Sequence, residues 1–268
     1  MGKPAVVVDN VSMKFNLSKE KVDNLKDYLI KFIKKEIKYN EFWALQNVNF
    51  EVQKGDRVGI LGLNGAGKST LLKVIAGVFK PTEGKVIKNG RLVPLLELGA
   101  GFDPQYTGRE NIYLYGAMLG YSKSFIEEKF DEIVEFSELK EFIDVPIKNY
   151  SSGMKARLGF SIATLVSPDI LILDDSASAL DFATDARLRS AIRRGTGSMT
   201  VFIVSQRAAS IKQADRILVL QNGRAAGLGN HEQLLADCEA YRRIVRSQMG
   251  AGRTWVRERN GNESTGTP

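Results

Sequence analysis

A glycine-rich run near the first quarter of the chain has the composition and spacing of a phosphate-binding loop. Its residues are Gly62, Leu63, Asn64, Gly65, Ala66, Gly67, Lys68, Ser69 and Thr70. The glycines allow consecutive backbone N–H groups to curl around a β-phosphate, and the Lys68 ammonium group neutralises the β and γ oxygens. The Ser69 hydroxyl is the expected magnesium ligand. The run therefore predicts a site for a nucleoside triphosphate with Mg²⁺.

Two further groups in the sequence could complete such a site. The apolar run at 170–173 ends in Asp174 and Asp175, and a buried strand of this kind delivers a carboxylate to magnesium at the carboxyl edge of a sheet. Tyr150 and the residues up to Met154 precede a helix. This order places the Ser151 side chain and the Gly153 backbone at a helix N-terminus, which has the geometry to bind an anion. A plain helix N-cap is the alternative interpretation.

The elements around these residues follow the order strand, loop, helix. Val58 to Leu61 is a compact apolar strand, and Ser69 to Val78 has helical periodicity. Asp169 to Leu173 and Met199 to Val204 are apolar runs typical of strands buried in a parallel sheet. Arg109 to Leu139 is mostly helical with a break near Gly120, which predicts a helical lobe over about 107–160 inserted between the loop and the carboxylate strand.

Shorter elements are expected on either side of these. Trp43 to Val52 predicts a pair of strands, and Lys85 to Pro94 predicts a hairpin that turns at Asn89 and Gly90. Ile217 to Ala226 predicts a second hairpin. His231 to Gln248 predicts one closing helix, with His231 near its start as a packing or capping residue.

The composition is that of a globular protein, with 43% hydrophobic residues among 268. One α/β domain over 1–250 is expected, followed by a flexible tail at 251–268. The sequence has no apolar run long enough to span a membrane and no signal-peptide pattern, so we expect a cytoplasmic protein. The single cysteine, Cys238, excludes an internal disulfide.

The net charge of +7 is concentrated near the N-terminus. Seven lysines lie in the segment 19–38, and Val22, Leu25 and Leu29 begin an apolar stripe at helical spacing. The segment 16–41 is therefore expected to contain an inserted basic amphipathic helix. Its lysine-rich face is either simply solvated or in contact with lipid headgroups or a membrane partner. No nucleic-acid partner is expected.

These motifs together resemble the ATP-binding-cassette (ABC) ATPases. The resemblance rests on 62–70, 150–154, 169–175 and 178–181, and it covers about 5–249. It implies a P-loop NTPase of the ABC type, with a central mixed or parallel sheet, an antiparallel β subdomain and a helical subdomain. It also implies ATP and Mg²⁺ as cofactors, and a head-to-tail homodimer or heterodimer in which Ser151 and Gly153 of one chain close over the partner's ATP. A separate membrane permease subunit would hold the dimer at the cytoplasmic face of the plasma membrane.

The two halves of the chain are similar to different branches of this family. The run at 95–102, the segment at 107–111 and the insertion between Phe15 and Trp43 resemble ATPases that export polysaccharides of the teichoic acid and O-antigen types. From Asp175 onward the chain is similar to multidrug-type half-transporters. Polysaccharide export is the leading hypothesis and export of drugs or peptides the alternative. A switch ATPase acting in DNA repair or translation, or a join of two parts that drives no transport, are the remaining hypotheses.

Several positions depart from the pattern that the resemblance implies. The catalytic set would be Lys68, Asp175 and Gln206, but the family usually has glutamate at the second position and histidine at the third. Because placement of the attacking water is sensitive to small shifts, we expect tight ATP binding with slow turnover. Glu97 is the nearest polar residue to the place of the usual magnesium-contacting glutamine. Candidates for stacking on adenine are Phe15, Phe42 and Trp43, which could equally be packing aromatics.

Overall fold

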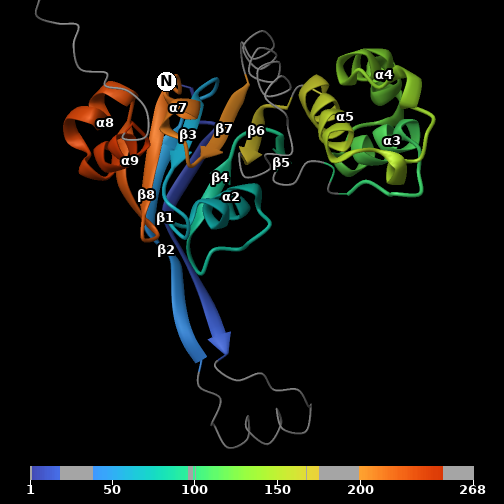
Figure 1. The fold of residues 1–268 in the computed structure, drawn as a ribbon. Coiled ribbons are helices and arrows are strands. Elements are labelled where there is room, and N and C mark those ends of the chain that lie inside the picture. Colours follow the sequence, from blue (N-terminus) through green and yellow to red (C-terminus); the bar gives the residue numbers. More distant parts are fainter. Residues whose placement is uncertain are drawn as a thin grey trace, which may run out of the picture.

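The structure is a computed structural model in which residues 2–18, 39–95, 99, 101–166, 168–174 and 199–249 are described (Figure 1). The strands are β1 (Val6–Ser18), β2 (Tyr39–Val52), β3 (Arg57–Leu61), β4 (Glu83–Lys88), β5 (Leu92–Leu95), β6 (Ile170–Asp174), β7 (Thr200–Ser205), β8 (Arg216–Gln221) and β9 (Arg224–Gly229). The α-helices are α2 (Lys68–Ala76), α3 (Gly108–Met118), α4 (Lys123–Ser137), α5 (Ser152–Leu165), α7 (Ala208–Ile211), α8 (His231–Asp237) and α9 (Glu239–Met249). Short 3-10 turns lie at Lys140–Phe142 and Ile147–Asn149.

The central sheet has six strands in the order β5-β6-β7-β3-β8-β9. The first five run parallel, and β9 returns antiparallel to β8. This sheet confirms the predicted α/β class and the predicted hairpin at 217–226. The hairpin predicted for 85–94 is wrong, because β4 joins the other sheet while β5 pairs with β6.

A second, antiparallel sheet has the order β2-β1-β4. β2 is one continuous strand from Tyr39 to Val52, so the strand pair predicted at Trp43 to Val52 is wrong. β1 and β2 extend beyond β4 as a two-stranded ribbon (Figure 1). The bounds predicted for the basic helix need correction, since 16–18 and 39–41 lie in these strands; 19–38 fall outside the described residues, as does the predicted tail at 251–268.

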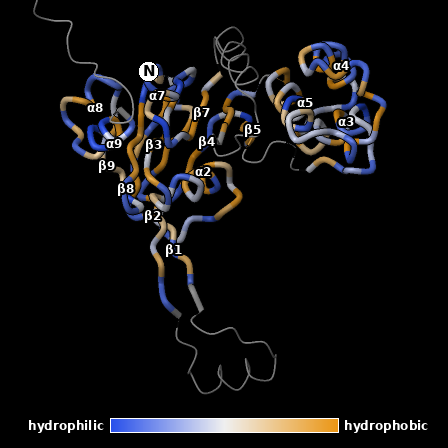
Figure 2. Tube along the Cα trace, in the orientation of Figure 1, coloured by the Kyte–Doolittle hydropathy of each residue, from blue (hydrophilic) through white to orange (hydrophobic). Residues whose placement is uncertain are grey.

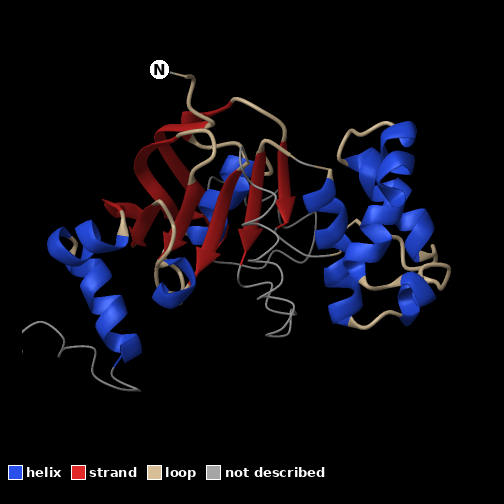
Figure 3. Ribbon diagram, turned by 90° about the horizontal axis from the view of Figure 1, so that it is seen from above, coloured by secondary structure: helices blue, strands red, loops and turns tan. Residues whose placement is uncertain are grey.

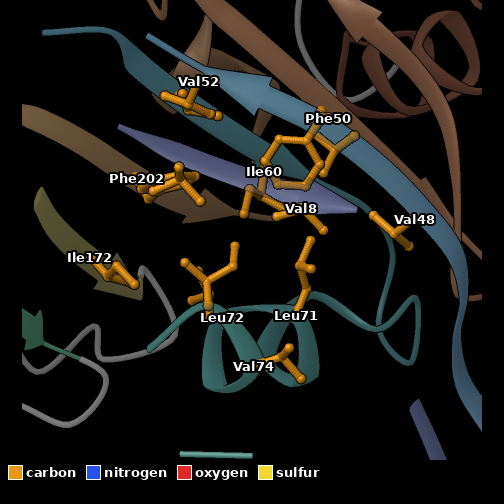
Figure 4. Packing of buried hydrophobic residues seen from close by; sticks show 14 of the residues in the cluster. Val8, Val48, Phe50, Val52, Ile60, Leu71, Leu72, Val74, Ile172 and Phe202 are labelled. Atoms are coloured by element: carbon orange, nitrogen blue, oxygen red, sulfur yellow. The ribbon is translucent and has the colours of Figure 1, made fainter. Parts of the chain in front are cut away.

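The main core lies between the two sheets and surrounds α2. In Figure 4, Leu71 and Leu72 of α2 point toward Ile60 of β3 and Val8 of β1. All four side chains are at most 2% exposed. The colouring of Figure 2 agrees, with hydrophobic residues along β7 and β8 and many hydrophilic ones on α4. Burial on this scale holds α2 against both sheets, and α2 begins at Lys68, within the predicted phosphate loop at 62–70.

The helices α3, α4 and α5 pack together at one end of the central sheet, and α8 and α9 lie at the other (Figure 3). The helical lobe has its own buried cluster, which includes Ile112, Ile133 and Leu158. A capping box starts α3, because the Thr107 hydroxyl accepts from the backbone N–H of Glu110 and the Glu110 carboxylate accepts from that of Thr107. The bounds predicted for the helical lobe, about 107–160, stay a prediction.

The C-terminal part of the described chain forms two helices, so the single closing helix predicted for 231–248 is wrong. α8 ends at Asp237, and the extended backbone at Cys238 (φ −113°, ψ 106°) separates it from α9. His231 lies in the first turn of α8 and its Nδ1 is 2.7 Å from the Tyr241 hydroxyl, which agrees with the packing role expected for it. Tyr241 is fully buried and anchors α9 against the sheet.

Candidate nucleotide site

The predicted loop connects the end of β3 to the start of α2 and lies close to neighbouring backbone. A Cβ at Gly62 would come within 2.6 Å of the Leu220 carbonyl oxygen, and one at Gly67 within 2.6 Å of the Ala44 carbonyl oxygen. Gly67 also has a φ of +100°. Side chains are thus excluded at both ends of the loop, which leaves its backbone as the available surface.

Lys68 folds back over this loop. Its Nζ donates to the carbonyl oxygen of Gly62 at 2.8 Å and to that of Leu63 at 2.9 Å, and the residue is 8% exposed. The ammonium group is buried and held by carbonyl oxygens, and a buried positive charge of this kind favours an anion as a further partner. The structure therefore brings together the lysine and the glycines that the sequence singles out.

The N-terminus of α2 opens onto the same place. Its N-cap is Gly67, and the helix start has no side-chain cap hydrogen bond. Ser69 and the loop residues Asn64 and Gly65 are exposed, while Thr70 is half-buried and Ala66 is buried. A helix start without a capping side chain presents backbone N–H groups and a positive dipole to an anion. The geometry can hold a phosphate group.

Three parallel strands bring the remaining polar positions to one edge of the sheet. β7 lies between β3 and β6, with Ser205 paired to Leu61 and Asp174 paired to Val204. Gln206, which is exposed, follows Ser205 and so lies between the loop and the end of β6. Asp175 and Glu97 lie outside the described residues, and their predicted roles stay predictions.

The chemistry of this edge fits magnesium. Mg²⁺ is usually held by one or two carboxylates, a hydroxyl, waters and substrate phosphates rather than by an all-protein cage. Ser69 is the second residue of α2, which follows β3, and Asp174 ends β6 at the same edge. Among the described residues there is no group of three or more His, Cys, Asp and Glu that could hold a metal by itself. A site that needs the phosphates of a nucleotide is consistent with this set.

Of the three predicted adenine contacts, Phe15 and its cross-strand partner Phe42 lie on one face of the β1–β2 ribbon, and Trp43 lies on the other. Phe15 is paired with Phe42, and Lys14 with Trp43, so neighbouring pairs point to opposite sides. The Phe15 ring packs edge-on against Phe79, which follows α2, with ring centroids 5.8 Å apart. The Lys14 Nζ lies 5.5 Å from the centre of the Trp43 ring on the other face. One base cannot stack on both Phe15 and Trp43.

Ser151 and Gly153 lie at the start of α5, and Figure 1 shows α5 beside α3 and α4, apart from α2. Ser151 caps α5, since its Oγ accepts from the Met154 backbone N–H at 3.2 Å. Its neighbourhood is open: the nearest atom to a Cβ built on Gly153 would be the Ser151 Oγ at 3.9 Å. The N-cap interpretation is therefore supported by the structure, and the exposed surface leaves room for a second molecule.

Sequence reasoning missed two contacts that support the site. Gly223, in the β8–β9 turn, donates from its backbone N–H to the Ala66 carbonyl oxygen at 3.1 Å and accepts from the Gln46 N–H at 2.8 Å. Gln248 of α9 contacts the turn after β7. The Asn222-Gly223 pair is a visible turn signal, but its proximity to the loop depends on long-range packing.

The sheet, the glycine loop and the lysine at the start of a buried helix define a P-loop nucleoside triphosphatase. Residues 45–178 match the protein family described as ABC transporter. The chain belongs to this family and is one of its ATPases, which confirms the class predicted from the sequence.

Relatives and solved structures agree with this assignment. The chain is 39% identical over 247 residues to the O-antigen export system ATP-binding protein RfbB of Klebsiella pneumoniae, a match that covers 91% of this chain and 99% of the relative. It is 42% identical over 204 residues to the teichoic acids export ATP-binding protein TagH of Lactococcus lactis, covering 75% of this chain and 43% of that protein. A solved ATP-binding subunit of an ABC transporter has the same fold, with a TM-score of 0.71, 20% identity, and coverage of 90% of this chain and 99% of that one. None of the helices in the described ranges has the length and apolarity needed to cross a bilayer.

Proposed function

We propose that the loop at 62–70 binds Mg-ATP. The backbone N–H groups of the loop and the Lys68 ammonium group would hold the β- and γ-phosphates, with Ser69 and Asp174 as magnesium ligands. Bound Mg²⁺ supplies neutralisation of charge on the transferred phosphate. Phe15 is a better adenine partner than Trp43, because its face of the ribbon is the one that packs against Phe79, just after α2.

The active unit is proposed to be a head-to-tail dimer. Ser151 is exposed and Gly153 half-buried at the start of α5, which belongs to the helical lobe and not to the part of the chain that carries the loop. An α5 N-terminus directed at a γ-phosphate would therefore come from a second chain. The same surface serves a homodimer or a heterodimer.

Hydrolysis is proposed to be slow. Gln206 follows the central strand β7 at the edge where the loop and Asp174 lie. An amide at this position accepts and donates hydrogen bonds but does not take up a proton at neutral pH, unlike histidine. With aspartate at 175, the attacking water would be held less well than by the longer glutamate.

The transported substrate is proposed to be a cell-surface polysaccharide of the O-antigen or teichoic acid type, moved by a separate membrane subunit at the cytoplasmic face of the plasma membrane. The observation that carries this proposal is the 39% identity to the Klebsiella O-antigen export protein over 99% of that protein's length. A match over 91% of this chain includes the helical lobe as well as the nucleotide-binding loop.

A complementation experiment tests the proposal. A Klebsiella strain lacking its O-antigen export ATP-binding protein is given this chain, and O-antigen at the cell surface is measured. Restored O-antigen with the unchanged chain, and none with Lys68→Ala expressed at the same level, is the expected result. If this chain instead co-purifies with a drug-exporter half and restores no polysaccharide, the proposal of polysaccharide export is wrong.

A further inference from the structure

The side chain of Gln248, which lies on α9, holds the turn that follows β7. The Nε2 of Gln248 donates to the Gln206 carbonyl oxygen, and the Oε1 of Gln248 accepts from the Ala208 backbone N–H at 2.9 Å. Both bonds come from one amide group on α9. Gln248, which carries it, lies 42 residues after Gln206 in the chain. The same turn is closed locally by Arg207, whose backbone N–H donates to the Ser205 Oγ at 2.9 Å.

α9 has little freedom to move relative to this turn. Tyr241, Ile244 and Val245 of α9 are buried in one cluster with Ala208 and with Leu61, the last residue of β3. The helix that carries Gln248 therefore shares a buried cluster with the end of β3 and with α7, the helix that follows the turn after β7. A shift of α9 would be transmitted to the Gln206 backbone through the Gln248 amide.

We infer that Gln248 is a positioning residue for ATP hydrolysis, which fixes the backbone at Gln206 without contacting the nucleotide. The inference rests on the proposed site, since it takes the edge between the loop and Asp174 as the place of reaction. Gln206 cannot act as a proton acceptor, so its contribution depends on where its backbone and amide are held. Loss of the two bonds would leave this turn free to move, and displacements of about 1 Å can reduce a rate by about a hundredfold.

Three variants of the full-length chain test the inference. Gln248→Ala removes both hydrogen bonds, and Gln248→Glu keeps the acceptor for the Ala208 N–H but places a second carboxylate oxygen against the Gln206 carbonyl. Gln213→Ala is the matched control, because Gln213 is an exposed glutamine in the turn after α7. The first measurement is amide exchange of Ala208 without nucleotide, which should become about tenfold faster in Gln248→Ala and stay unchanged in the control.

The second measurement is steady-state hydrolysis of Mg-ATP. Both Gln248 variants should lose about tenfold in kcat with KM for ATP unchanged. Gln248→Glu should recover toward the unchanged chain as pH falls, because a protonated carboxyl group can again donate to the Gln206 carbonyl. Unchanged kcat and unchanged exchange in Gln248→Ala would overturn the inference, as would a loss of kcat that follows a lowered melting temperature and shows no recovery with pH. Failure of the unchanged chain to bind ATP is a distinct result, which contradicts the proposed site, while the exchange measurement still decides whether Gln248 holds the turn.

Discussion

The Lys68 ammonium group donates a hydrogen bond to the Gly62 carbonyl oxygen at 2.8 Å, and this bond spans the glycine-rich turn between the two residues. The lysine that is proposed to neutralise phosphate is thus already directed into the loop, held by carbonyl oxygens of the same segment. Less conformational entropy is then lost when a nucleotide binds, because the side chain has few rotamers to give up.

Removal of the Lys68 charge should abolish most of the ATP affinity. Lys68→Ala is expected to weaken Mg-ATP binding by about 10- to 100-fold, the value of one charge-assisted hydrogen bond or slightly more. A fluorescent ATP analogue measures the Kd. Lys73→Ala, on the same helix but beside the Phe79 ring, is the control and should bind normally. Equal affinity of the two variants would contradict the phosphate role of Lys68.

The two glycines with positive φ in the loop should differ in their tolerance of a side chain. Gly65 has a φ of +77° and no neighbour within 4 Å of a Cβ, whereas a Cβ at Gly67 would meet the Ala44 carbonyl oxygen at 2.6 Å. Gly65→Ala should cost about 1 kcal/mol from backbone strain alone. Gly67→Ala should cost about 3 kcal/mol or more, because β2 must also move. Urea denaturation measures both, and equal losses would show that the loop does not pack against β2 as described.

The two positions that depart from the family pattern should limit turnover. Asp175→Glu combined with Gln206→His is expected to raise steady-state hydrolysis about tenfold or more, because a longer carboxylate and a titratable ring would hold the attacking water better. Phosphate release measures the rate. The same pair combined with Lys68→Ala is the control for contaminating ATPases. The absence of any gain from the double substitution would contradict the account of slow turnover.

Ser151 is expected to have a structural role and a dimer role that can be separated. Ser151→Ala loses the bond to the Met154 N–H and should lower stability by about 1 kcal/mol. Ser151→Asp keeps a capping oxygen, so the melting temperature should be retained, but its charge would repel the phosphates of the partner's ATP. ATP-dependent dimers, measured by sedimentation, should therefore be lost in Ser151→Asp. Dimers that persist in this variant would leave Ser151 as a helix cap alone.

His231 should make the protein less stable in mild acid. Burial, together with the nearby charge of Lys212, lowers the pKa of His231 from its usual value of 6.5. The unfolded chain therefore takes up a proton more readily than the folded one as pH falls below about 6.5, so the folded state loses stability in that range and not above it. The melting temperature of the unchanged chain should fall more between pH 7.5 and 5.5 than that of His231→Gln, measured in the same buffers. Parallel curves would contradict a lowered pKa.

The central parts of the site were predictable because their signals are local. The spacing from Gly62 to Ser69 predicts where the loop ends and the helix begins. The apolar run from Val58 to Leu61 predicts a buried strand from its own residues alone. The misassigned hairpin at 85–94 shows the limit. Asn89-Gly90 is a strong turn signal, but the Asp169 carboxylate accepts from the Arg91 N–H at 2.7 Å and directs the chain into the other sheet beside β6. Contacts of this kind, like that of Gln248 with Gln206, join residues that are far apart in sequence and leave no local pattern.

The most direct test of the central claim is the stoichiometry of nucleotide and chain in the same complex. Native mass spectrometry of the chain in saturating Mg-ATP, with Asp175→Asn to prevent hydrolysis, counts both. In Mg-ATP, complexes of two chains with two ATP molecules are expected. When EDTA removes Mg²⁺, or when Lys68 is replaced by alanine, only single chains are expected. A monomer that binds one Mg-ATP, or a dimer that forms equally well without nucleotide, would contradict a nucleotide-closed dimer.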